Sequence, residues 1–456
     1  MRKLLILFTA LIALASCKKS NVEIFDERPE VRMSMSLAEV RTALLGAPNG
    51  WIATMPTSAG GGYGFYMQFD ASENVTMYSD LGVANSPSTT TLDYVTPLTS
   101  TYRLKAVLGV ELIFDTFNYT SYLVDPMPSV FGGAAATGYK SDIEFLFTRA
   151  TTDSLIFTGK KYRQVMAMVK ATAAQKASYE AGGYKTAIDN FKAFFENIKN
   201  PYIEYTSGSA TLKAAISMNF SNVLATGKRV SFTGLLADGA VATAESKFGL
   251  TIDGASLPAG LSFQGINFTR IAWKDATTMA FYDTKGSEYV IKSNPVPLTP
   301  LASLYKYNGT YNGLFISGQV LPAGVTSDFN GVFNAMVNRF NGTGRTITSV
   351  EFKLLNSTTA KLEIWYMSNT SAFLADASFT YTYVNDVITL SNYVPAVSNA
   401  NWTTRITQIG DFKDWFINGT FRVDWVVSSN PATGTLGGLY RTTDAGSVMY
   451  GTPRKI

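Results

Sequence analysis

Alternating apolar and polar positions recur along most of the chain and predict β-strands separated by turns. In the clearest case, Phe379, Tyr381 and Tyr383 fall on one face of an extended run, and Thr380 and Thr382 fall on the other. Further aromatic or β-branched runs are bounded by turn-forming residues. They predict strands at 51–55, 64–69, 75–78, 111–117, 120–124, 143–147, 229–233, 263–269, 278–282, 350–354, 361–366 and 421–427. We expect these strands to pair as antiparallel hairpins.

Two segments have helical spacing instead. The first follows a capping-box pattern at Ser36 and Glu39 and places Leu37, Val40 and Leu44 on one helical face. The second covers 172–199, where apolar residues recur every three or four positions and Gly182-Gly183 divides or starts the helix. Its apolar stripe consists of Ile188, Phe191, Phe194, Phe195 and Ile198. We expect this stripe to pack on a sheet.

These patterns predict a mainly β protein with two short helical insertions, α+β overall, built from antiparallel β-sandwich or barrel-like domains. Pro295, Pro297 and Pro300 mark a linker. We therefore expect an N-terminal β-rich domain with flanking helices at 34–200, a middle β region at 201–300, and a C-terminal β-sandwich or barrel-like domain at 301–456.

The N-terminus has the parts of a secretory signal peptide at 1–16: two basic residues, an apolar run and small residues. The join Leu14-Ala15-Ser16-Cys17 resembles a lipobox, and the chain contains no other cysteine. We expect cleavage before Cys17, acylation of its thiol, and a lipidated tether at 17–33 that holds the body to a lipid membrane. The alternative is an ordinary signal peptide with an incidental cysteine.

The residues after Cys17 bear on which membrane the chain reaches. Lys18 and Lys19 stand where an aspartate would favour retention in an inner membrane. We therefore expect an outer-membrane location in the cell envelope, with the periplasmic and surface faces both open.

Composition restricts the chemistry. Histidine is absent, which excludes His-based metal sites and the Ser-His-Asp and Cys-His nucleophile systems. Removing Arg2 and Lys3 from 38 basic residues leaves 36 against 34 acidic residues, a net charge of +2, without the basic patch that nucleic acid requires. We expect no metal, no cofactor and no nucleic-acid partner. Paired carboxylates are the catalytic chemistry that composition still allows.

Short motifs between residues 24 and 161 carry a family resemblance. They are Ile24-Phe25-Asp26, Ala47-Pro48-Asn49-Gly50-Trp51, the glycine-rich turn into Gly64-Phe65, Phe69-Asp70, Leu112-Ile113-Phe114-Asp115-Thr116-Phe117-Asn118, Asp142-Ile143-Glu144-Phe145 and Gly159-Lys160-Lys161. Together they resemble a family of uncharacterised Bacteroidetes lipoproteins known only as a domain of unknown function. Members are typically encoded beside starch-utilisation-type uptake systems. The resemblance implies an accessory role in nutrient capture, with a TonB-dependent channel and a ligand-capture lipoprotein as partners.

Exposed aromatic rings are the candidate ligand-binding groups, since a flat apolar ring can cover one face of a sugar. Trp402 and Trp415 lie in polar stretches and are the candidates for such binding. Trp51, Trp365 and Trp425 lie in strand patterns and are expected in the core.

No residue qualifies as catalytic from the sequence. Asp142 and Glu144 are expected to share one strand face, where they either bind a cation or are solvated, with solvation favoured. The function that follows is a non-catalytic binding or accessory lipoprotein of an outer-membrane nutrient-uptake system. The alternatives are a carboxylate-based hydrolase acting on glycans or peptides, and a structural envelope lipoprotein.

Overall fold

The structure is a computed structural model that describes residues 29–81, 93, 95–107, 109–236 and 240–456. The predicted signal peptide, Cys17 and the tether up to residue 28 lie outside the described residues. The chain divides into two compact units. The first runs to Asp189 and includes Phe220–Arg229 and Lys247–Ala259, and the second comprises Asn190–Asn219, Val230–Ser246 and Gly260–Ile456.

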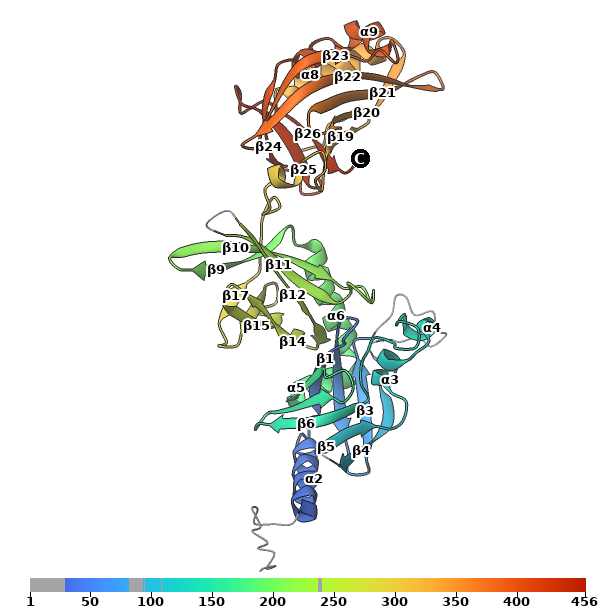
Figure 1. Cartoon of the computed structure of the whole chain (residues 1–456), viewed down its shortest axis with the longest axis vertical. Helices are drawn as coiled ribbons and strands as arrows, with labels where there is room; N and C mark the ends of the chain where they lie inside the picture. Colours follow the sequence, from blue (N-terminus) through green and yellow to red (C-terminus); the bar gives the residue numbers. More distant parts are fainter. Residues whose placement is uncertain (1–28, 82–92, 94, 108, 237–239) are drawn as a thin grey trace, which may run out of the picture. The chain divides into compact units, whose positions relative to one another are not determined.

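The first unit contains an eight-stranded antiparallel barrel, which closes because β1 pairs with both β2 and β8 (Figure 1). Alternate side chains of β1, including Trp51, Ala53 and Met55, fill its core. The strands are β1 (Trp51–Pro56), β2 (Gly62–Phe69), β3 (Asn74–Ser79), β4 (Leu98–Ala106), β5 (Val110–Phe114), β6 (Glu144–Ala150), β7 (Ser154–Gly159) and β8 (Val165–Lys170).

Helix α2 (Pro29–Leu45) precedes this barrel and begins earlier than the Ser36 cap predicted. The Trp51 indole Nε1 donates to the Leu44 carbonyl at 2.9 Å, which fixes the end of α2 to the start of β1. The second predicted helix is confirmed as α5 (Ala173–Glu180) and α6 (Gly183–Asn197), divided at Gly182.

The strand predicted at 120–124 is wrong, because that segment forms α3 (Tyr119–Val124), followed by α4 (Pro128–Phe131). Asn118 caps the helix: its side-chain oxygen accepts from the Thr120 backbone amide at 2.9 Å. The Ser121 hydroxyl in turn accepts from the Asn118 backbone amide at 3.0 Å. This capping box satisfies amides at the helix start and outweighs the strand preference of the β-branched residues.

Two five-stranded sheets follow, in the orders β12-β11-β10-β9-β18 and β13-β14-β15-β16-β17. The Phe232 ring of the first sheet lies edge-on to Phe263, Phe268 and Phe281 of the second, so aromatic rings form the core between them. The strand predicted at 263–269 is interrupted by a turn at 264–265. The strands are β9 (Pro201–Ser207), β10 (Ala210–Asn219), β11 (Arg229–Leu235), β12 (Val241–Lys247), β13 (Gly249–Thr251), β14 (Gly254–Phe263), β15 (Ile266–Trp273), β16 (Met279–Asp283), β17 (Glu288–Val290) and β18 (Lys292–Ser293).

The C-terminal region forms a second closed eight-stranded antiparallel barrel. The alternation predicted around Phe379 is confirmed: Phe379 and Tyr381 are buried, whereas Thr380 and Thr382 are exposed. Its strands are β19 (Gly313–Ser317), β20 (Arg345–Leu354), β21 (Thr359–Ser368), β22 (Ser371–Val384), β23 (Val387–Pro395), β24 (Thr420–Val426), β25 (Leu436–Arg441) and β26 (Val448–Arg454).

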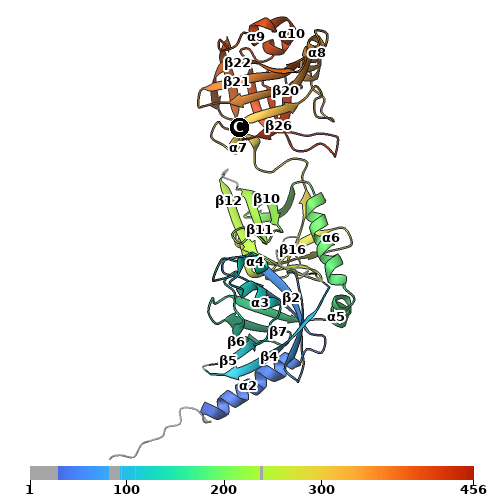
Figure 2. The same ribbon diagram turned by 90° about the vertical axis from the view of Figure 1, so that its right-hand side faces the viewer.

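Short helices complete this barrel (Figure 2). Helix α8 buries one apolar stripe in the barrel core at helical spacing: Phe329, Phe333, Met336, Val337 and Phe340. The helices are α7 (Leu301–Leu304), α8 (Phe329–Asn341), α9 (Asn401–Thr404), α10 (Ile406–Ile409) and α11 (Asp411–Asp414).

The prediction of a mainly β fold with antiparallel, barrel-like sheets is confirmed, and short helices beyond the two predicted ones occur at strand connections. Within the described ranges, none of the helices combines the length and the apolarity that crossing a membrane requires.

A buried ion pair holds the first unit together. The Lys228 ammonium donates to Asp80 Oδ2, and the two side chains are 3% and 0% exposed. The same oxygen accepts from the Leu250 backbone amide at 2.7 Å, and the Asp80 amide donates to the Gly64 carbonyl at 3.0 Å. Burial raises the pKa of the Asp80 carboxyl, and the Lys228 ammonium opposes that shift. Asp80, directly after β3, therefore joins β2 through its backbone amide to two later chain segments through its carboxylate.

We expect Lys228→Met to lower the free energy of unfolding by about 3–5 kcal/mol, because it leaves the Asp80 charge buried without its partner. Urea unfolding followed by circular dichroism measures this. Lys185→Met is the matched control, since the Lys185–Asp189 pair is about half exposed and such pairs contribute only about 0–1 kcal/mol. Equal losses in the two variants would contradict the assigned role of the buried pair.

Candidate functional site

The two tryptophans predicted to bind ligand lie in the core of the C-terminal barrel. Trp402 is fully buried and its Nε1 donates to the Tyr393 hydroxyl at 2.5 Å. Trp415 is 6% exposed, donates to the Ser447 hydroxyl at 2.9 Å, and stacks on Phe421. The prediction that Trp402 and Trp415 bind a ligand is therefore corrected, because neither ring offers an open face. Their polar neighbours belong to the short helices α9 and α11, which turn the rings inward.

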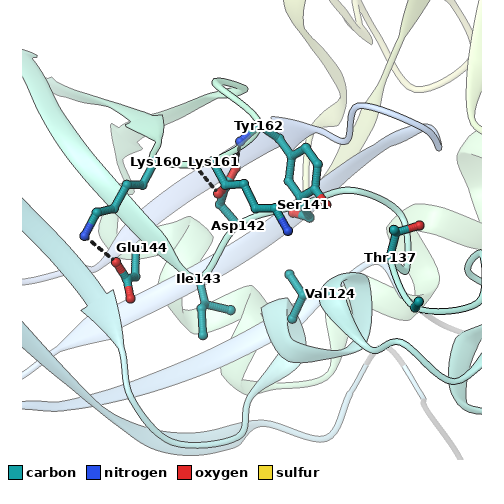
Figure 3. A pocket seen from close by; sticks show the side chains of 10 residues that line it. Val124, Thr137, Ser141, Asp142, Ile143, Glu144, Lys160, Lys161 and Tyr162 are labelled. Atoms are coloured by element: carbon teal, nitrogen blue, oxygen red, sulfur yellow. Dashed lines mark hydrogen bonds and ion pairs between the residues drawn. The ribbon is translucent and has the colours of Figure 1, made fainter.

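The first barrel contains a pocket of about 340 Å³ beside the start of β6 (Figure 3). Three segments form it: the end of α3, the loop before β6, and the turn between β7 and β8. Two of the sequence motifs, 142–145 and 159–161, meet here. The lining residues are Val124, Ala136, Thr137, Ser141, Asp142, Ile143, Glu144, Lys160, Lys161 and Tyr162.

Asp142 organises the turn that carries the pocket's basic and aromatic side chains. Its Oδ1 accepts from the Lys161 backbone amide at 2.8 Å, and its Oδ2 accepts from the Tyr162 amide at 3.0 Å. Gly159 is needed beside it, because a Cβ there would lie 2.2 Å from Asp142 Oδ2. The expectation that Asp142 and Glu144 share a strand face is wrong: β6 begins at Glu144, and Asp142 is a buried residue of the loop before it.

Lys160 engages the other carboxylates around the pocket. Its ammonium lies 2.7 Å from Glu144 Oε2 and 3.1 Å from Glu111 Oε2, and Glu111 is buried. Hydrogen bonds to Glu144 and Glu111 raise the pKa of Lys160. The carboxylates of Glu144, Glu111 and Asp142 are thus each held by a donor of the protein.

Lys161 and Tyr162 are open to a ligand. The Lys161 ammonium lies 4.9 Å from the centroid of the Tyr162 ring, and Figure 3 shows the two side chains beside each other. Lys161 is exposed and forms no ion pair with any carboxylate in the described part of the chain. Ser141 and Thr137 also line the pocket. This is an arrangement of hydrogen-bond donors, one aromatic face and some apolar surface.

The carboxylates that line the pocket are already engaged by donors of the protein. Neither Asp142 nor Glu144 is therefore free as the acid and base that hydrolysis of a glycan needs. The described residues also hold no group of three or more acidic side chains placed to bind a metal ion. The sequence shows the two motifs, 142–145 and 159–161, but it does not show that they meet. Their meeting depends on how β6, β7 and α3 are joined.

We expect Asp142→Ala to lower the free energy of unfolding by about 1–3 kcal/mol, because two partly buried backbone amides lose their charged acceptor. Asp142→Asn keeps one acceptor oxygen and should lose less. Urea unfolding measures both, and hydrogen exchange at the Lys161 and Tyr162 amides reports the turn directly. Unchanged protection of those amides in Asp142→Ala would count against this role.

Comparison with known proteins identifies the family. No curated protein matches the chain. Among solved structures, the chain is similar to the beta subunit from DNA polymerase of Streptococcus pyogenes, with 11% sequence identity and a TM-score of 0.14 over 93% of this chain and 98% of that chain, a score too low to carry any argument. A family model matches residues 21–275, more than half of the chain and including the whole pocket. The chain therefore belongs to the family described as Domain of unknown function (DUF4302).

Proposed function

We propose that this chain is a non-catalytic binding lipoprotein of the bacterial cell envelope that serves an outer-membrane nutrient-uptake system. In this proposal Cys17 carries the acyl chains, and the barrel behind it binds a hydroxyl-rich nutrient such as a sugar. A TonB-dependent channel and a ligand-capture lipoprotein are the partners that the sequence resemblance to Bacteroidetes lipoproteins implies.

The proposal rests on the way in which the charged groups of the pocket are paired. Lys160 pairs with Glu144 and Glu111, and Asp142 binds backbone amides, so these groups form a fixed polar wall. The Lys161 ammonium and the Tyr162 ring lie open on that wall. A sugar can place a ring face on Tyr162 and accept a hydrogen bond from Lys161, while its hydroxyls reach Ser141 and Thr137.

The anchor is tested by replacing the lipidated residue. We expect the full chain with Cys17→Ser to lose metabolic labelling by palmitate and to leave the membrane fraction, because the thiol that accepts diacylglycerol is gone. Fractionation of cells that produce the two forms measures this. A Ser16→Ala variant keeps the thiol and serves as the control. Labelling that persists in Cys17→Ser would refute the lipoprotein assignment.

Ligand binding is tested on purified residues 18–456 with a panel of neutral oligosaccharides in isothermal titration calorimetry. We expect Lys161→Ala and Tyr162→Ala each to weaken binding about tenfold, the loss of one central contact. Tyr162→Phe should bind nearly as well as the parent, because it keeps the ring. Lys105→Ala, which removes an exposed lysine of the same barrel, should have no effect.

The same samples separate binding from hydrolysis. Incubation with each glycan should release no new reducing ends, because the pocket carboxylates are engaged by the protein. Release that disappears on replacing one Asp or Glu would instead establish a carboxylate-based hydrolase. If replacing Lys161 or Tyr162 leaves the affinity unchanged, the ligand binds outside this pocket.

A further inference from the structure

Trp365 differs from the other tryptophans in its exposure. Trp365 lies on the C-terminal barrel and is 40% exposed. Its place in a strand pattern had predicted a position in the core. Trp51, Trp402, Trp415 and Trp425 are buried, and Trp273 is half-buried against Phe194. Trp365 therefore presents an apolar ring to solvent, where a ligand can reach it.

The register of the barrel defines what surrounds the ring. Trp365 on β21 lies opposite Ser349 on β20 and Leu374 on β22, and Ser349 lies opposite Ser317 on β19. Residues directly opposite share one face of a sheet. Because Ile364 and Tyr366 point into the core, this row faces outward. The ring is therefore flanked by two serine positions on one side and a half-buried leucine on the other.

The serine hydroxyls are available to a ligand. Ser317 is exposed and Ser349 is half-buried. Neither hydroxyl takes part in a hydrogen bond with another residue in the described portion of the chain. Trp365, Ser349 and Ser317, which we call the Trp365 row, thus combine one ring face with unused donors and acceptors.

The row beside it carries three carboxylates in direct register. Glu351, Glu363 and Asp376 lie opposite one another on β20, β21 and β22, and all three are buried. Like charges in such positions repel one another unless they are compensated.

Three cationic side chains compensate these three carboxylates. Arg454 binds Glu351 with two hydrogen bonds of 2.5 and 2.7 Å. Lys353 lies 2.7 Å from Glu363, and Lys361 lies 2.5 Å from Asp376. The six charges sum to zero, so this row adds no net charge that would attract an ionic ligand. The network also holds the backbone of β20, β21 and β22 in fixed positions.

We propose that the Trp365 row binds one pyranose ring of a neutral glycan. A lone exposed ring flanked by one half-buried leucine lacks the contiguous apolar centre that a stable protein interface has. The neighbouring charges are already paired with one another, so this row offers an anionic or cationic ligand no unpaired charge of opposite sign. A sugar ring matches the remaining features: an apolar face for the indole and hydroxyls for Ser349 and Ser317. This surface goes beyond the proposed pocket and stands on different residues.

The experiment uses residues 18–456 in the Lys161→Ala/Tyr162→Ala background, so that the pocket cannot contribute. Affinity electrophoresis in gels that contain pullulan, xylan or galactomannan measures binding, with pectate as an anionic comparison. We expect at least one neutral polysaccharide to retard the chain, and Trp365→Ala to weaken that binding tenfold or more. Trp365→Phe should retain most of it, since a ring remains.

Phe373→Ala is the matched control. Phe373 is 37% exposed on the adjacent strand, but it stacks on Tyr366 and so belongs to the opposite face. Its loss should leave glycan binding unchanged. Thermal unfolding of each variant confirms that the barrel is intact. The Trp365→Phe variant should also lose the change in tryptophan fluorescence that the glycan produces, because the reporting ring is the exposed one.

Three results would overturn the proposal: no retardation by any neutral polysaccharide, equal retardation of the parent and Trp365→Ala, or stronger retardation by pectate. A change in the oligomeric state of Trp365→Ala, measured by light scattering, would also overturn it and would assign the row to a protein contact. Failure of these tests leaves the pocket proposal unaffected, because the pocket residues are already replaced in this background.

Discussion

The first unit depends on a carboxylate that water cannot reach. Asp80 Oδ2 accepts from the Lys228 ammonium and from the Leu250 amide, so a single oxygen joins chain segments that lie 148 and 170 residues away. Gly64 makes this approach possible, since a Cβ there would lie 1.8 Å from the Leu250 carbonyl oxygen. A buried charge tolerates few alternative partners, and the pair therefore determines which segments pack against β2 and β3.

In both barrels, the charged side chains beside the proposed binding surface are paired within the protein. In the first barrel, Lys160 and backbone amides engage the carboxylates beside the pocket. In the second, Arg454, Lys353 and Lys361 match three buried carboxylates beside Trp365. Closed sheets supply rigid positions for these networks because every strand is paired on both sides. What stays open to solvent is then an aromatic ring with hydrogen-bonding groups, the combination expected for hydroxyl-rich ligands.

Local sequence signals were reliable where the deciding interaction is itself local. The alternation at Phe379 and Tyr381 and the divided helix around Gly182 both match the structure. The strand predicted at 120–124 failed although its cause was also local: Asn118 and Ser121 form a capping box that could have been read from the sequence. Helix α8 was missed, even though its buried residues follow helical spacing from Phe329 to Phe340.

The sequence by itself determined strand periodicity and the two predicted helices, and it limits the possible chemistry because histidine is absent. The resemblance to a lipobox at Cys17 is likewise a property of the sequence. Where a strand carries large apolar side chains on both faces, only the tertiary structure decided which face meets water. Trp365 shares a face with Lys361 and Glu363, yet only closure of the barrel makes that face the outer one. Trp402, set among polar residues, became core because α9 turns it inward. Periodicity is local, whereas burial depends on contacts between residues far apart in the chain.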